Sequence, residues 1–110
     1  MEETTLYQKL TREILQEFPF PMHFRGYAYL CSAITLYAQK SQIKKLNELY
    51  QQISDNPAWE TDDCIRRTIL YAWKHGNPDI WKKYFPEHIT RPSVFVFIKT
   101  IARHLVSDTD

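Results

Sequence analysis

Apolar residues recur along most of the chain at intervals of three and four, which is the spacing of one face of an α-helix. Polar and turn-forming residues separate these periodic stretches, so the pattern predicts six helices. They span about residues 4–17, 25–39, 43–53, 61–75, 78–84 and 94–106. We therefore expect an all-α fold, a compact bundle of about six helices that forms a single domain over residues 1–110.

Local signals set the ends of the expected helices. Phe18-Pro19-Phe20-Pro21 ends the first, because proline disfavours helical geometry in the residue before it. Ser54-Asp55-Asn56-Pro57 is a turn cluster, and Thr61 is expected to cap the fourth helix. Gly76 is expected to end that helix in a left-handed conformation, and Asn77-Pro78 to open the next.

The segment Val94-Phe95-Val96-Phe97-Ile98 has two interpretations. Its residues have strong strand propensity. However, Ile101, Ala102 and Leu105 continue the apolar pattern at helical spacing, and the chain offers no second strand for pairing. We therefore expect a buried helix here, with Ser93 as its cap.

Composition indicates a folded helical protein without a general attraction to nucleic acid. The hydrophobic fraction is 44%, and two glycines, Gly26 and Gly76, are few for a strand-rich fold. The net charge of +1 is unevenly distributed, with +2 over residues 40–50, −4 over 55–63 and +4 over 64–83. Local patches steer partners more than the total does, so the charge does not exclude DNA.

The chain lacks the motifs of common enzymes. No glycine-rich phosphate loop occurs, and the four histidines have no metal-binding spacing with each other or with Cys31 and Cys64. A Cys/His nucleophilic pair stays open, because such pairs meet only in space. We expect a protein that is not an enzyme, with no metal, no cofactor and no small-molecule substrate.

Neither a membrane span nor a leader segment is expected. No apolar run approaches the roughly 20 residues that a transmembrane helix requires. The acidic start Met1-Glu2-Glu3 is unlike a signal peptide. These features favour a cytoplasmic protein.

The stretch from Ile65 to Asn77 predicts a helix with two different faces. Ile65, Ile69, Ala72 and Trp73 share one side, and Arg67, Tyr71 and Lys74 share another. With the preceding helix this segment can form a helix-turn-helix, whose second helix enters the major groove through its N-terminal half. The same pattern fits two packed helices with a solvated basic face, and both interpretations stay open.

Three blocks resemble one known family, in the same order over about residues 14–106. The blocks are His23-Phe24-Arg25-Gly26-Tyr27-Ala28-Tyr29-Leu30 with Ala33-Ile34, then Ile65-Arg66 with Ile69, Ala72-Trp73 and Gly76-Asn77, and finally Arg91-Pro92 with Phe97-Ile98. They resemble the C-terminal DNA-binding effector domain of the stage-zero sporulation protein A family, the response regulator of sporulation initiation. Here that domain would stand alone, without a receiver domain.

The resemblance implies a helix-turn-helix in a transcriptional regulator of sporulation. It implies double-stranded DNA as partner, and a homodimer or tandem dimer with the last helix near the contact. Arg66 and Arg67 match recognition-helix positions, and Arg25 matches a basic residue suited to a phosphate. From the charge and face analysis we add four candidates to this DNA-binding set, namely Lys44, Lys45, Tyr71 and Lys74.

The start of the expected recognition helix departs from the family. Glu60 and Asp63 stand where the family has arginines, and Asp63 lies four residues before Arg67, so that the two can pair. A carboxylate is repelled by phosphates, although it can accept a hydrogen bond from a cytosine amino group. An alternative function therefore stays open, in which a protein-interaction module has kept the fold, lost DNA binding and antagonises a full-length regulator.

Overall fold

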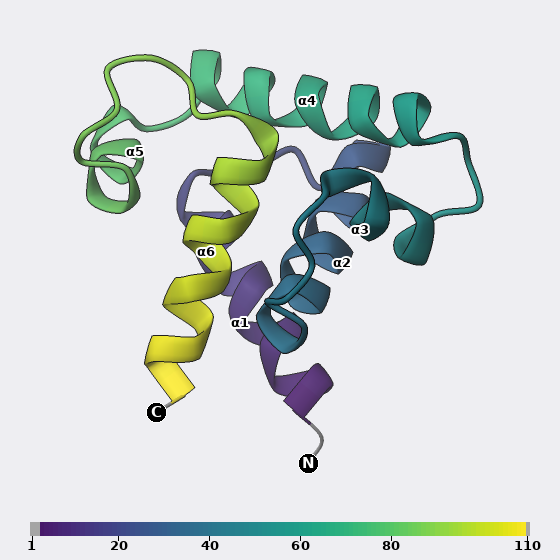
Figure 1. The fold of residues 1–110 in the computed structure, drawn as a ribbon. Coiled ribbons are helices and arrows are strands. Elements are labelled where there is room, and N and C mark those ends of the chain that lie inside the picture. The colour runs from purple at the N-terminus through teal and green to yellow at the C-terminus, as the bar shows by residue number, and fades with distance from the viewer. Residues whose placement is uncertain (1–2, 110) are drawn as a thin grey trace.

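The computed structural model describes residues 3–109, and all of its regular structure there is helical (Figure 1). The elements are α1 (Glu3–Glu17), α2 (Arg25–Gln39), α3 (Leu46–Ile53), α4 (Ala58–His75), α5 (Pro78–Tyr84) and α6 (Val94–Thr109). The expectation of an all-α bundle with six helices is confirmed. Within the described part of the chain, no helix is both long and apolar enough to cross a membrane.

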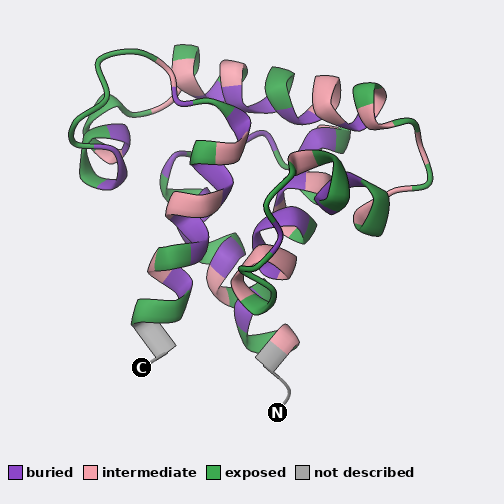
Figure 2. Ribbon diagram, viewed as in Figure 1, coloured by how far each residue is buried: buried purple, intermediate pink, exposed green. Residues whose placement is uncertain are grey.

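Helix α2 is the centre of the bundle. It packs against α1, α3, α4 and α6, and its residues Leu30, Ala33 and Ile34 are fully buried. Helix α4 lies across one end of the bundle, above α2, α3 and α6 (Figure 1). Its underside is buried and its outer side is exposed (Figure 2), so α4 forms much of one surface of the molecule.

Gly26 lets α2 and α4 approach each other closely. A Cβ atom added at Gly26 would lie 2.1 Å from the carbonyl oxygen of Cys64 and 2.1 Å from Oγ1 of Thr68. Thr68 is itself fixed, because its hydroxyl donates a 2.8 Å hydrogen bond to that carbonyl. Only glycine fits this crossing without displacing one helix from the other.

An aromatic cluster fills the core where α1, α5 and α6 meet. Phe18 is fully buried, and its ring centroid lies 4.7 Å from that of Trp81 and 5.6 Å from that of Phe97. Burial of an aromatic side chain stabilises a fold strongly, so this cluster holds the short α5 against the bundle.

The starts of the third and fourth helices differ from the sequence prediction of 43–53 and 61–75. Helix α3 begins at Leu46, because Ile43 reaches the core from the preceding loop and is 7% exposed. Helix α4 begins at Ala58 after Pro57. Thr61 therefore lies inside the helix, is fully buried and has no hydrogen-bond partner for Oγ1 among the described residues, so the prediction that it caps α4 is wrong.

Gly76 ends α4 for a different reason from the one expected. Its φ of −87° and ψ of −169° are extended, so the predicted left-handed conformation is wrong. A Cβ atom there would lie 2.5 Å from the carbonyl oxygen of Phe18. That oxygen accepts a 3.0 Å hydrogen bond from the amide of Asn77, so the position needs glycine for a close backbone approach.

The other helix ends agree with the local signals. Asn77 caps α5 by accepting a 2.9 Å hydrogen bond from the amide of Asp79, and Pro78 is the first helical residue. The segment with strand propensity is helical, as expected, and Ser93 Oγ accepts a hydrogen bond from the amide of Val96 at 3.3 Å.

Candidate nucleic-acid interface

Helix α4 has the two faces that the periodicity predicts. Ile65, Ile69 and Ala72 are at most 1% exposed, whereas Arg67 and Lys74 lie on the exposed side. The outer side of α4 is exposed or partly exposed along the helix (Figure 2). This face is therefore accessible to a large partner.

Every arginine of the candidate site has a carboxylate of α4 beside it. The pairs are Arg66 with Asp62 at 2.5 Å, Arg67 with Asp63 at 3.0 Å, and Arg25 with Glu60 at 3.9 Å. The pairing of Asp63 with Arg67 that the sequence suggested is confirmed. Residues 58–67 carry three acidic and two basic side chains, a net charge of −1. The N-terminal half of α4 thus offers cations whose charges are already balanced.

Asp62 connects α4 to α3. One of its oxygens accepts a 2.5 Å hydrogen bond from Nη2 of Arg66, and the other accepts one of 2.5 Å from the hydroxyl of Tyr50. Tyr50 is 1% exposed, and burial, followed by the hydrogen bond to Asp62, raises the pKa of its hydroxyl. The side chain of Arg66 is consequently held toward α3.

Asp63 lies on the outer face and contacts a different part of its arginine. Its Oδ2 atom lies 3.0 Å from Nε of Arg67. The side chain of Arg67 is 77% exposed, and that of Asp63 is 41% exposed. Among the described residues, Arg67 has no other ion pair and no side-chain hydrogen bond.

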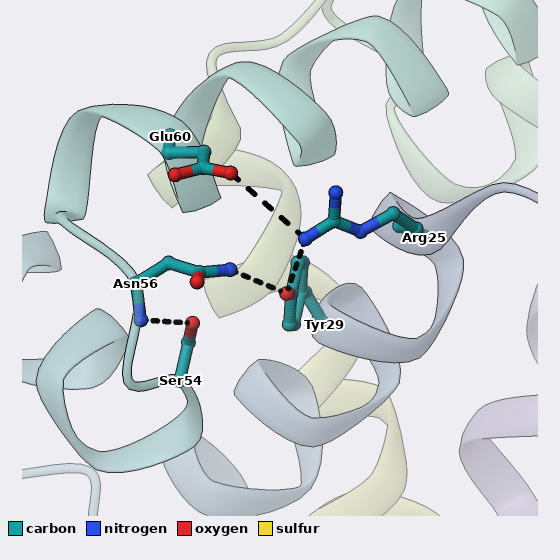
Figure 3. A network of polar contacts seen from close by, with 5 residues as sticks. All are labelled: Arg25, Tyr29, Ser54, Asn56 and Glu60. Carbon is teal, nitrogen blue, oxygen red and sulfur yellow. Dashed lines mark hydrogen bonds and ion pairs between the residues drawn. The ribbon is translucent and has the colours of Figure 1, made fainter.

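A polar network fixes the turn between α3 and α4 against α2 (Figure 3). The hydroxyl of Tyr29 accepts hydrogen bonds from Nδ2 of Asn56 at 2.8 Å and from Nη2 of Arg25 at 3.4 Å. Ser54 Oγ accepts a 3.0 Å bond from the amide of Asn56, and Glu60 faces the same guanidinium. The contact with Tyr29 raises the pKa of Arg25, which keeps its charge at the edge of the α4 face.

The remaining candidates divide between two sides of α4. Tyr71 packs toward α2, with its ring centroid 5.2 Å from that of Phe24, and is 44% exposed. Lys44 and Lys45 are exposed in the segment before α3. Leu46, which follows them, lines a hollow of about 340 Å³ together with Arg66. The segment before α3 therefore lies on the opposite side of α4 from Tyr71. Lys74 is exposed and has no ion pair within the described residues.

One comparison with known proteins decides the family. Residues 11–105 match the family described as "Sporulation initiation factor Spo0A C terminal". The chain belongs to this family. Its members are DNA-binding effector domains of the sporulation response regulator, with an all-α fold, and the family is not one of enzymes. The resemblance drawn from the three sequence blocks is confirmed.

Within this Spo0A C-terminal fold, sequence reasoning missed one prominent side chain. Trp59 is the second residue of α4 and is 72% exposed. The helix predicted over residues 61–75 does not include this tryptophan, whereas the structure places it in the first turn of α4. Pro57 was the signal available, since proline is frequent at helix starts.

No alternative chemistry appears elsewhere in the part of the chain that the structure describes. No group of three His, Cys, Asp or Glu side chains there could hold a metal ion. Neither Cys31 nor Cys64 is hydrogen-bonded to a described histidine, and both are free thiols. Burial raises the pKa of the Cys31 thiol, which makes it a poor nucleophile.

Proposed function

We propose that this protein is a DNA-binding transcriptional regulator of sporulation that uses α3 and α4 as a helix-turn-helix. The observation that carries the proposal is the position of α4, which follows α3 after a short turn and lies across the outside of the bundle (Figure 1). A helix in this position can enter the major groove of double-stranded DNA through its N-terminal half. Membership of a DNA-binding family supports the same partner.

The candidate residues have two roles in this proposal. Arg66, Arg67 and Tyr71 belong to the recognition helix itself. Phosphate contacts come from both sides of it, through Arg25, Lys44, Lys45 and Lys74. Phosphate contacts supply most of the affinity, and base contacts supply the specificity.

The three ion pairs weaken this binding without preventing it. A solvent-exposed ion pair contributes at most about 1 kcal/mol. The three arginines are all more than half exposed, so solvent screening limits how strongly each pair holds its cation back from DNA. The proposed site is a weakened DNA-binding surface, and affinity should rise when the carboxylates are neutralised.

The first test is fluorescence anisotropy of the purified protein with a labelled random duplex over a salt series. Binding should weaken steeply with salt, and Lys74→Ala should lower the slope by about 0.9. Lys9→Ala, an exposed position on α1, is the matched control and should leave the slope unchanged. A folded protein that binds no duplex at low salt would contradict the proposal.

A second test removes one of the carboxylates. Glu60→Gln frees Arg25 from its partner at 3.9 Å, so affinity for the random duplex should rise several-fold. Glu13→Gln makes the same charge change on the exposed side of α1 and should have little effect, because salt screens charges beyond about 10 Å. An equal rise in both variants would mean that overall charge, and not the α4 face, controls binding.

The alternative function is an interaction module that kept the fold without DNA binding and antagonises a full-length regulator. The net charge of −1 over residues 58–67, with each arginine paired, favours it. Under this alternative, the wild type should bind no duplex but should lower the binding of a full-length regulator to its operator in a mobility-shift assay. It also predicts that Glu60→Lys with Asp63→Lys converts this non-binder into a DNA binder.

A further inference from the structure

Arg66 and Arg67 engage their carboxylates through different nitrogen atoms. Arg66 uses Nη2, one of the two terminal nitrogens of its guanidinium, and Arg67 uses Nε, at the inner end of the group. The terminal nitrogens form the fork that binds two acceptors at once, such as the O6 and N7 atoms of guanine. The two neighbouring arginines therefore differ in what they can still bind.

One of the two nitrogens in the fork of Arg66 is already engaged. Its Nη2 donates to Asp62, which is only 27% exposed and also accepts the hydroxyl hydrogen bond of the buried Tyr50. Turning Arg66 toward DNA would leave Asp62, whose other oxygen accepts the hydrogen bond from Tyr50 of α3, without its cation. Arg66 is thus committed to Asp62, the residue that holds Tyr50.

The fork of Arg67 is available. The contact at Nε leaves both terminal nitrogens without an ion pair or hydrogen bond to any described residue, and the side chain is 77% exposed. Asp63 meanwhile restricts the orientation of the guanidinium. A free arginine side chain has a large rotamer entropy, so a group held in place before binding loses less on binding.

We propose that Arg67, oriented by Asp63, reads a guanine in the major groove, and that Arg66 makes no base contact. This inference rests on the proposed function. Asp63 is a positioning residue in this arrangement, since it acts through Arg67. Its charge also repels phosphates, which lowers the affinity for DNA of unrelated sequence and sharpens discrimination.

The test uses the preferred duplex obtained by selection from a random pool with the wild-type protein. Each guanine of that duplex is replaced in turn by 7-deazaguanine, which lacks the N7 acceptor, and affinity is measured by anisotropy. At one guanine the replacement should weaken wild-type binding roughly tenfold or more. The same replacement should have no effect on the affinity of Arg67→Ala, which has no donor for the guanine.

Matched variants separate the reading of guanine from a structural effect. Arg66→Ala should keep the full discrimination between guanine and 7-deazaguanine. Asp63→Asn should lose part of this discrimination and bind random duplex more tightly. Asp63→Glu, which keeps the carboxylate, should retain the discrimination. A variant that merely disturbed the fold would weaken binding to both duplexes equally.

Several outcomes overturn the inference. If discrimination survives Arg67→Ala at every guanine, or is lost in Arg66→Ala, the assignment of Arg67 is wrong while the proposed function stands. The same holds if the protein binds duplex but selects no guanine-containing sequence. If the wild type binds no duplex at low salt, both the assignment and the proposed function are wrong.

Discussion

Asp62 and Asp63 are neighbours in the chain, yet they have different surroundings. Successive residues on a helix point about 100° apart, so one carboxylate faces α3 and the other faces solvent. Asp62 accepts hydrogen bonds from Tyr50 and Arg66, and Asp63 contacts only Arg67 among the described side chains. A change at Asp62 should therefore alter stability, and a change at Asp63 should alter DNA recognition.

Replacing Tyr50 by phenylalanine should destabilise the protein by about 1 kcal/mol. The change removes the 2.5 Å hydrogen bond to Asp62 and leaves the buried ring in place. Urea denaturation measures the loss as a lower midpoint with an unchanged slope. Tyr37→Phe is the control, because the Tyr37 hydroxyl has no hydrogen bond with the described residues. Equal losses in the two variants would contradict the role given to Asp62.

The elements of the candidate interface are positioned by contacts between helices that are distant in sequence. Gly26 sets how closely α2 approaches α4, and the hydroxyl of Tyr29 holds the turn before α4 through Asn56 (Figure 3). These contacts explain how α4 can expose one whole side and still keep a fixed orientation.

Replacing Gly26 by alanine should cost about 1–3 kcal/mol of stability, as overpacking does. The new Cβ would lie 2.1 Å from the Cys64 carbonyl oxygen, and backbone atoms cannot yield as a flexible side chain can. Urea denaturation measures the loss, and DNA affinity should fall as α4 shifts. Ser32→Ala, at an exposed position of α2, should change stability by less than about 0.5 kcal/mol. Normal stability in Gly26→Ala would mean that the two helices are farther apart.

The cap of α5 should contribute about 1 kcal/mol, which Asn77→Ala would remove. The Asn77 side chain accepts the 2.9 Å hydrogen bond from the amide of Asp79 at the start of this short helix. Asn77→Asp keeps the acceptor and should retain most of the stability, as measured by urea denaturation. If alanine and aspartate destabilise equally, the side-chain cap has no role.

On the scale of the whole molecule, Glu17 joins the end of α1 to α5. It accepts a 2.6 Å hydrogen bond from the hydroxyl of Tyr84 and lies 3.0 Å from Nζ of Lys83. The hydrogen bond from Tyr84 lowers the pKa of Glu17 below its ordinary value of 4.5, with a smaller opposing effect of burial. The ionised form is therefore favoured by folding.

This shift fixes the direction of a pH dependence. The contribution of Glu17 is fully present above pH 4.5, the ordinary value, and is lost as the pH falls through the lower pKa of the folded state. Glu17→Gln should lower the free energy of unfolding at neutral pH, and that free energy should then fall less as the pH decreases. Urea midpoints between about pH 3 and pH 7 measure this, with Glu13→Gln on the same helix as control. A parallel pH profile in wild type and Glu17→Gln would contradict the linkage.

Local signals predicted some elements correctly and misplaced others. Asn77-Pro78 gave the start of α5 correctly, because a cap and a proline act on the residues next to them. Thr61 has the chemistry of a cap but is buried inside α4, and Ile43 has the spacing of a helix but reaches the core from a loop. In both cases burial, which depends on distant residues, decided the outcome.

The sequence by itself determined the number and order of the helices, the two faces of α4 and the pair of Asp63 with Arg67, because these depend on residues within about one helical turn of each other. Only the tertiary structure decided that Arg25 meets Glu60, that Tyr50 holds Asp62, and that Gly26 and Gly76 stand where backbones approach. These contacts join segments far apart in the chain, and no local spacing specifies them. The contact between Tyr50 and Asp62 also separates Arg66, whose partner is fixed to α3, from Arg67, whose terminal nitrogens stay available.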